Sequence, residues 1–303
     1  MPWIFAAELA LHGPNASDTS MSLTAARRYC DRLARSHSEN FTVVSLLLPR
    51  RLIPHFHAIY AYCRWADDLA DETGGGTRAL ELLAWWRREL LAAFAGEPRH
   101  PITMAVADTA KKFGIPPDPF LSLLLAFEQD QRVNRYATFA DLLDYCRRSA
   151  NPVGHLLLYL FECFTPDRAA LADDVCTGLQ LANFWQDVSR DLGKNRVYLP
   201  AEDRDRFGHT DADLFARRFT PQFAEMQRFQ VDRTRGYFER GRGLLPLLPR
   251  DVRIDVELFI RGGEAVLTAI ERQRYDVWTQ RPVVSKWKKA ELLARAIAGR
   301  WGT

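Results

Sequence analysis

Apolar residues recur along most of the chain at the three- and four-residue spacing of amphipathic helices, and no stretch alternates as a half-buried strand would. The breaks fall at turn-forming sequences such as TGGGT (73–77) and GEPRHP (96–101). Helices are predicted over about 20–36, 51–72, 78–95, 101–113, 117–130, 138–148, 153–163, 167–191, 211–245, 250–275 and 284–298. Because no linker is long or low in complexity, the pattern predicts one all-α domain over residues 1–303.

Composition and charge narrow the class of protein. The chain has 303 residues, 47% of them hydrophobic, and its formal net charge of +3 is too small to predict a nucleic-acid partner. The five cysteines are odd in number and form no C-x-x-C pair, which indicates free thiols in a reducing compartment. The N-terminus lacks the basic region of a signal peptide, and no apolar run approaches the ~18 residues of a membrane span. A cytoplasmic protein is predicted.

One predicted helix carries an acidic stripe within CRWADDLADE (63–72). At ~100° per residue, a single narrow stripe contains Tyr60, Arg64, Asp67 and Asp71, with Asp68 and Glu72 beside it. The rest of the helix is mostly apolar. For this helix alone, a polar arc that faces water is an equally good interpretation.

A second predicted helix favours a functional role for the acidic stripes over a polar arc that simply faces water. Gln180, Asn183, Asp187 and Asp191 share one stripe at spacings of three, four and four, and apolar residues cover almost all the remaining circumference. Such a helix is usually central. In a partly dry cavity, two carboxylates at ~4 Å repel each other by on the order of 4 kcal/mol. One arginine is too little positive charge to offset both stripes, so further cations are expected.

Divalent cations would supply that charge. Mg²⁺ prefers oxygen ligands and is typically held by one or two carboxylates plus substrate phosphates. Two facing acidic stripes therefore predict a Mg²⁺ cluster that grips a diphosphate between helices. The seven histidines are scattered and form no H-x-x-x-H or H-x-x-E pattern, which argues against a zinc site. The pair of E-x-x-H motifs that a ferritin-like di-iron site needs is also absent.

Both acidic blocks resemble those of the squalene/phytoene synthase family, over about residues 37–287. The family's two D-x-x-x-D motifs correspond to Asp67/Asp71 and Asp187/Asp191, within YAYCRWADDLADE and GLQLANFWQDVSRDLGKNRVYLP. Either block alone is moderately specific, whereas both in order are a strong signal. The resemblance implies the class I terpenoid synthase fold, a single-domain helical bundle with a central cavity.

The resemblance also assigns roles to residues of this sequence. It implies Mg²⁺ ligands at Asp67, Asp68, Asp71, Asn183, Asp187 and Asp191. It implies contacts to the substrate diphosphate from His37, Ser38, Phe41, Arg64, Lys194, Arg196 and Tyr198. It places Gln180 beside the reacting carbons, and it places Tyr60 and Tyr145 at the cavity, where they would stabilise carbocations. Without the family, Lys194 and Arg196 are an ordinary basic helix end, and Tyr198 is a packed aromatic residue.

Departures from the family pattern favour one branch. Members that condense two prenyl diphosphates usually carry Lys or Arg where this chain has Glu39 and Asn40, and Arg where it has Gln186. The block SANPVG (149–154) resembles instead the branch that converts presqualene diphosphate to hydroxysqualene in bacterial squalene and hopanoid biosynthesis. Loss of diphosphate, rearrangement of the cation and capture by water would follow, with Asn151 placing the water. The alternative is that Asn151 only caps a kink at Pro152.

Other activities stay open from the sequence. They are head-to-head condensation of two prenyl diphosphates to presqualene diphosphate, squalene or phytoene; a Mg²⁺-dependent helical nucleoside-phosphate hydrolase; and a non-catalytic scaffold. NADPH is not expected, because the chain has no strand-flanked G-x-G-x-x-G, although the family binds NADPH without that motif.

The resemblance also suggests partners, because a hydroxysqualene product must leave into lipid. Other enzymes of the squalene route are expected as functional partners. The basic, Trp-containing tail KWKKAELLARAIAGRW is a candidate for peripheral membrane contact. The alternative is a tail that packs on its own domain. The tail's cations and rings are Lys286, Trp287, Lys288, Lys289, Arg295, Arg300 and Trp301.

Overall fold

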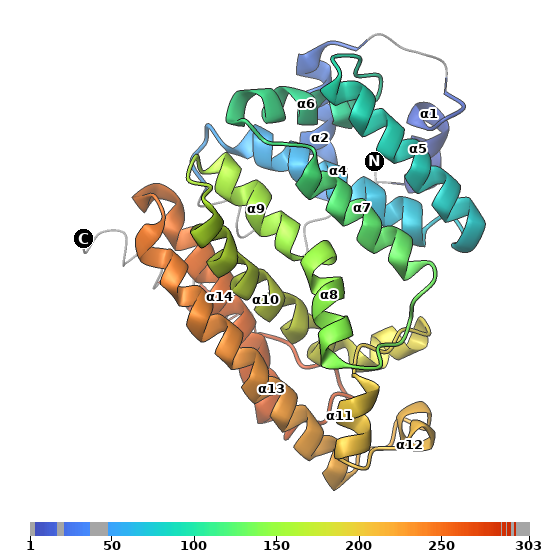
Figure 1. Ribbon diagram of the computed structural model, residues 1–303, viewed down its shortest axis with the longest axis vertical. Helices are drawn as coiled ribbons and strands as arrows, with labels where there is room; N and C mark the ends of the chain where they lie inside the picture. The colour runs from blue at the N-terminus through green and yellow to red at the C-terminus, as the bar shows by residue number, and fades with distance from the viewer. Residues whose placement is uncertain are drawn as a thin grey trace. The chain divides into compact units, whose positions relative to one another are not determined.

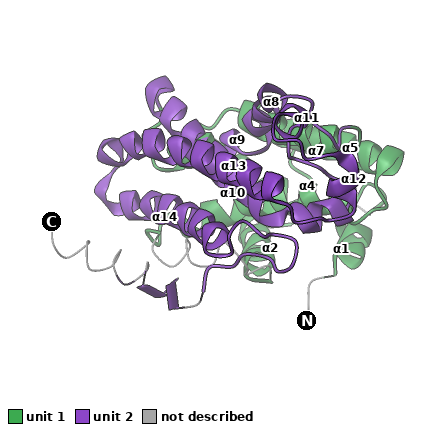
Figure 2. Cartoon of the chain, turned by 90° about the horizontal axis from the view of Figure 1, so that it is seen from below, with its two compact units in different colours: residues 1–132, 155–164 green, residues 133–154, 165–303 purple. Residues whose placement is uncertain are grey.

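The computed structural model describes residues 4–16, 21–36, 48–285, 287, 288, 290, 291 and 294. Within these ranges every regular element is helical, apart from one isolated bridge between Arg135 and Val197, so the all-α prediction is confirmed. The chain divides into two compact units, Met1–Arg132 with His155–Phe164, and Val133–Gly154 with Thr165–Thr303 (Figure 2). The one-domain organisation stays a prediction. None of the described helices is both long and apolar enough to cross a bilayer.

Most predicted helices are found within a few residues of their expected bounds (Figure 1). Unit 1 contains α1 (Phe5–His12), α2 (Leu23–Ser36), α4 (Ile53–Asp71), α5 (Gly76–Phe94), α6 (Pro101–Phe113) and α7 (Asp118–Asp130). Unit 2 contains α8 (Phe139–Ser149), α10 (Pro166–Gly193), α11 (Ala201–Arg206), α12 (Asp211–Phe215), α13 (Pro221–Gly241), η1 (Arg242–Leu247) and α14 (Arg250–Arg272). Helix α9 (Asn151–Leu160) begins in unit 2 and ends in unit 1.

Helix α4 is the centre of unit 1, with α2, α5, α6 and α7 packed against it. Tyr62 and Trp65 of α4 are fully buried, and Tyr62 stacks on Trp86 of α5 with ring centroids 5.5 Å apart. The short helix α1, which the sequence pattern did not predict, adds Phe5 edge-on to Trp65 at 5.1 Å. A large aromatic core therefore holds the helix that carries the first acidic motif.

Helix α10 is the centre of unit 2, and α13 and α14 run alongside it (Figure 1). The close approach depends on two glycines, because a Cβ at Gly178 of α10 or at Gly263 of α14 would overlap the ring of Phe238 from α13. Trp185 is fully buried and its Nε1 donates to Thr234 Oγ1 at 2.8 Å. These contacts fix the rotation of α10 about its own axis, and with it the direction of its acidic stripe.

The prediction of a single helix over 211–245 is wrong. The chain forms α12, a turn, α13 and the 3₁₀ helix η1 instead. Arg217 adopts a left-handed backbone (φ 51°), which ends α12, and Thr220 caps α13 by accepting from Phe223 N, with Pro221 in the first turn. Of the helix expected over 284–298, only 287, 288, 290, 291 and 294 are described; Lys286, Lys289, Arg295, Arg300 and Trp301 lie outside the described residues.

Candidate functional site

The first acidic stripe is the accessible arc of an otherwise buried helix. Asp71 is exposed, whereas Tyr60, Arg64 and Asp67 are partly exposed on α4, and nearly all its other residues are buried. Burial raises the pKa of Tyr60, so its phenol keeps its proton at neutral pH. The predicted grouping of these side chains on one face is therefore confirmed.

Asp68 lies beside this arc and is only 1% exposed. Arg64 donates to Asp68 and lies 3.2 Å from the carboxylate of Asp67. One guanidinium thus serves two carboxylates within a single turn of helix. The structure gives Asp68 this local counter-charge, and its predicted role as a metal ligand stays a prediction.

The second acidic stripe is also the accessible arc of a central helix. Asn183 is exposed, Gln180, Asp187 and Asp191 are partly exposed, and the surrounding Leu, Ala, Phe and Trp side chains are buried. Asn183 Nδ2 donates to Asp187 Oδ2 at 3.0 Å, so the amide and the carboxylate four residues apart are already aligned. Oxygen donors therefore line one face of α10.

Asp191 is the acid of the second stripe whose pKa departs clearly from its ordinary value. Burial, and secondly the charge of Asp187, raise the pKa of Asp191 to about 7, although Arg196, Lys194 and Arg281 act in the opposite direction. The three nearby cations therefore do not outweigh burial and the neighbouring carboxylate. This places Lys194 and Arg196 in the electrostatic field of the motif, as their predicted role requires.

The raised pKa of Asp191 predicts how the metal-free protein responds to pH. A carboxyl whose pKa is higher in the folded chain than its unfolded value of about 3.9 stabilises the fold while it is protonated. That contribution is lost as pH rises from about 4 through 7. In EDTA, the melting temperature should therefore fall between pH 5 and pH 8 by more in the wild type than in Asp191→Asn. Equal falls in the two proteins would contradict the assignment.

Arg281 is a site residue that the sequence analysis missed. Its Nε donates to Asp187 Oδ1 at 2.5 Å, and one terminal nitrogen donates to Asp187 Oδ2 at 2.9 Å and to Gln186 Oε1 at 2.9 Å. Gln186 Nε2 in turn donates to the carbonyl of Pro282 at 2.5 Å. The segment after α14 is therefore tied to the second motif. Its sequence has no periodic pattern, so only the folded contact identifies Arg281.

A guanidinium on both oxygens of Asp187 competes with any metal ion for them. Arg281→Ala is therefore expected to tighten Mg²⁺ binding to the substrate-free protein by about five-fold, the equivalent of a ~1 kcal/mol ion pair. Isothermal titration calorimetry measures this directly. Arg261→Ala, which removes a similar half-exposed arginine paired with Glu257, is the control and should leave the affinity unchanged. Equal affinities for Arg281→Ala and wild type would show that the pair does not compete.

The structure assembles an aromatic cluster next to the second stripe. Tyr198 stacks on Phe184 with centroids 3.8 Å apart, and Tyr145 lies 5.9 Å from Tyr198. Tyr136 completes the group, stacked on Tyr198 at 5.8 Å, and all four rings are buried. Tyr145 and Tyr198, predicted separately, are thus brought together. Phe184 and Tyr136 were not predicted, because only the folded loop before α8 carries Tyr136 to this place.

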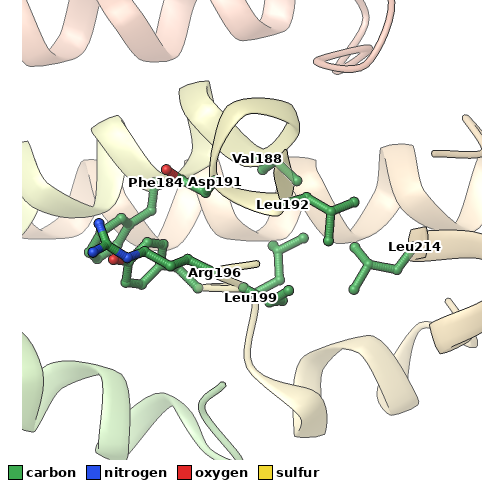
Figure 3. Close-up of a pocket in the computed structure, with 9 residues that line it drawn as sticks. Phe184, Val188, Asp191, Leu192, Arg196, Leu199 and Leu214 are labelled. Carbon is green, nitrogen blue, oxygen red and sulfur yellow. The ribbon is translucent and has the colours of Figure 1, made fainter. Parts of the chain in front are cut away.

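The loop that follows α10 places Lys194, Arg196 and Tyr198. Lys194 is the exposed C-cap of α10, Asn195 has a left-handed backbone (φ 59°), and the amide of Arg196 returns to the carbonyl of Asp191 at 2.8 Å. Residues of α10 and of this loop, among them Phe184, Asp191, Arg196 and Leu199, line a small hollow (Figure 3). Its volume is ≈ 10 Å³, about the room that one water needs. The hollow can hold a solvent molecule beside Asp191 and is too small for an isoprenoid.

Asn151 lies at the start of α9 and is buried. Its Oδ1 accepts a hydrogen bond of 3.0 Å from Thr177 Oγ1 of α10, which joins α9 to the helix of the second motif. A structural role is therefore visible, and water placement by Asn151 stays a prediction. His37, Ser38 and Phe41 lie outside the described residues.

The donor set can be tested against Mg²⁺. Among the residues that the structure describes, no three His, Cys, Asp or Glu side chains converge into one metal-binding group. Mg²⁺ needs only one or two carboxylates when phosphates and water complete its shell. Each stripe offers such a set, and on α10 the charge of Asp187 adds to burial in raising the pKa of Asp191, so additional positive charge there would favour the ionised pair. The residues fit Mg²⁺, while joint use of Asp67/Asp71 and Asp187/Asp191, which belong to different units, stays a prediction.

A family model and individual relatives both identify the squalene/phytoene synthase family. The sequence model of the squalene/phytoene synthase family matches residues 34–288. The chain is 31% identical to a phytoene synthase of Arthrospira platensis, over 88% of this chain and 93% of that protein. It is 30% identical to a 15-cis-phytoene synthase of Synechococcus elongatus, over 88% of this chain and 91% of that protein.

Solved structures agree. A squalene synthase, HpnC, from Alicyclobacillus acidocaldarius superposes with a TM-score of 0.81 at 44% identity, covering 85% of this chain and 97% of that one. A dehydrosqualene synthase in complex with ligand superposes with a TM-score of 0.83 at 26% identity, covering 93% of this chain and 98% of that one. The chain therefore has the class I isoprenoid synthase fold that the sequence motifs implied.

Proposed function

Because the chain belongs to the squalene/phytoene synthase family, we propose that it ionises presqualene diphosphate with bound Mg²⁺ and releases hydroxysqualene. The observation that carries the choice of a thirty-carbon, squalene-type product is the identity of 44% to a squalene synthase, against 31% and 30% to phytoene synthases. Family membership also leaves the nucleoside-phosphate hydrolase and the inert scaffold without support.

The use of a single diphosphate is supported by the surroundings of Gln186. Its amide is occupied at both ends, by Arg281 and by the carbonyl of Pro282. It therefore adds no positive charge of its own where members that condense two prenyl diphosphates usually carry arginine, and the guanidinium of Arg281 beside it is engaged by Gln186 and Asp187. Glu39 and Asn40 likewise replace expected cations. With fewer cations to neutralise phosphate oxygens, one diphosphate is better matched to this chain than two.

The residues around α10 are suited to the proposed chemistry. Mg²⁺ held by the two acidic stripes would stabilise the negative charge that develops on the departing diphosphate. Lys194 and Arg196 can orient the phosphate oxygens from the end of α10. The buried, mutually stacked rings of Tyr145, Phe184 and Tyr198 form an apolar wall next to α10, which would keep bulk water away from a carbocation held beside it.

The second candidate is the head-to-head condensation of two prenyl diphosphates. It is favoured by the relatives, which are named phytoene synthases, a squalene synthase and a dehydrosqualene synthase. This reaction would use the same acidic motifs and the same Mg²⁺. The two candidates differ in substrate, so product analysis separates them.

The test offers purified protein either presqualene diphosphate or farnesyl diphosphate, with and without Mg²⁺ and NADPH, and identifies products by gas chromatography and mass spectrometry. The proposal expects hydroxysqualene from presqualene diphosphate, no need for NADPH, and no product without Mg²⁺. Turnover of farnesyl diphosphate alone to presqualene diphosphate, squalene or a carotenoid precursor would overturn it in favour of the second candidate. An unchanged product profile in Asn151→Gly would remove water placement by Asn151.

A further inference from the structure

The turn between α12 and α13 exposes the sequence FARRF, residues 215–219. All five residues are exposed in succession, and the rings of Phe215 and Phe219 are 54% and 46% exposed. The flanking residues Leu214 and Phe223 are by contrast buried at 1% and 0%. The anchors on both sides hold the turn in place, so the two rings project from a fixed base.

Positive charge surrounds these rings. The guanidinium of Arg135 lies 5.6 Å from the centre of the Phe215 ring and donates to Asn195 O at 2.6 Å. Arg217 donates to Ser189 Oγ at 3.4 Å. Within the described part of the chain, neither Arg135 nor Arg217 has an acidic side chain among its ion-pair or hydrogen-bond partners. Arg218 is paired with Asp213 at 3.2 Å, so the surface as a whole is positive.

We propose that Arg135, Phe215, Arg217, Arg218 and Phe219 form a docking surface for an anionic lipid bilayer. Aromatic rings inserted below the headgroups, with guanidinium groups level with the lipid phosphates, are the arrangement by which peripheral proteins bind membranes. Two adjacent exposed rings without neighbouring cations would suit a protein partner equally well. Arg135 and Arg217, which have no acidic partner among the described residues, favour lipid phosphate instead.

The position of the surface suits exchange of an isoprenoid diphosphate with the membrane, and this part rests on the proposed function. Arg135 bonds to Asn195, which lies between Lys194 and Arg196, and Arg217 bonds to Ser189 between Asp187 and Asp191 in sequence. A prenyl diphosphate in a bilayer has its chains among the lipid tails and its diphosphate among the headgroups. Docking by this surface would bring the candidate diphosphate-binding loop to that same level.

The test is flotation of the full-length, metal-free and substrate-free protein with vesicles of phosphatidylglycerol and phosphatidylcholine. The wild type should float with the anionic vesicles, and less at about 0.5 M NaCl, where charges are screened within a few ångströms. Phe215→Ser/Phe219→Ser should lower the partition coefficient by about ten-fold or more. Arg217→Gln should lower it by about five-fold.

Leu247→Ser is the matched control, because Leu247 is 43% exposed and follows the other end of α13, a helix of 21 residues or about 30 Å. It should float as the wild type does. Flotation of the double Phe variant at wild-type levels would overturn the proposal. So would sedimentation showing that the same variant converts a dimer to a monomer, since the surface would then be a contact between copies. No substrate is present, so failure here leaves the product analysis unaffected.

Discussion

Asp187→Asn is expected to lower the rate of diphosphate release by about 10³-fold, the equivalent of ~4 kcal/mol of transition-state stabilisation. Asp187 is the first acid of the second motif, and it is aligned by Asn183 and Arg281. Asparagine keeps the shape of the side chain and one oxygen but removes the negative charge that strengthens the binding of Asp187 to Mg²⁺. Steady-state release of inorganic diphosphate from presqualene diphosphate measures the effect.

A matched substitution separates this effect from a general loss of charge on the helix. Asp167 lies in the exposed first turn of the same α10, so Asp167→Asn removes one acid from the helix but none from the stripe. Its rate should stay within about two-fold of wild type. A rate for Asp187→Asn within ten-fold of wild type, with both proteins folded, would remove Asp187 from the metal site.

Trp185→Ala is expected to lower the free energy of unfolding by about 3–5 kcal/mol, the usual cost of removing a buried Trp side chain. Trp185 is fully buried in unit 2, and its indole nitrogen donates to Thr234 Oγ1. The substitution leaves a cavity beside α13 and removes the hydrogen bond that Thr234 Oγ1 accepts, while the same hydroxyl still donates to Gln230 O at 2.8 Å. Trp185→Phe keeps most of the volume and should cost about 1–3 kcal/mol. Urea unfolding followed by far-ultraviolet circular dichroism gives both values.

The exposed Trp287 provides the comparison for this core substitution. It is 88% exposed, so Trp287→Ala should change the free energy of unfolding by no more than about 0.5 kcal/mol. A loss below 1 kcal/mol for Trp185→Ala would mean that Trp185 does not hold α10 in its rotation. The direction of the second acidic stripe would then need another cause.

The sequence was most informative where a helix is buried on nearly every side. On α4 and α10, the few polar positions stand out against apolar neighbours. Helical periodicity of ~100° per residue therefore predicted shared faces for the two acidic motifs, and the structure places both on accessible arcs. The residues are Asp67, Asp71, Asp187 and Asp191. Helical periodicity is a strong signal for elements of this kind. It also gave the all-α class correctly.

The sequence was least informative where contacts come from segments distant along the chain. Arg281 reaches Asp187 from 94 positions away, and Tyr136 joins Tyr198 through a loop. Neither contact has a periodicity, so neither could be read from one helix. The break of the expected 211–245 helix was missed because Arg217 ends α12 by a left-handed backbone that arginine rarely adopts. The turn it creates is the one that exposes FARRF.

In the proposed mechanism, the two acidic motifs act together on one diphosphate through shared metal ions. These motifs are Asp67/Asp71 and Asp187/Asp191. The most direct measurement counts bound Mn²⁺ by electron paramagnetic resonance in the presence of an unreactive thiolodiphosphate analogue of the substrate. The comparison includes wild type, Asp67→Asn and Asp187→Asn. The account predicts that tight Mn²⁺ binding requires the analogue, and that either substitution weakens the binding of both metal and analogue by at least about ten-fold. Wild-type binding of metal and analogue by Asp67→Asn would contradict it.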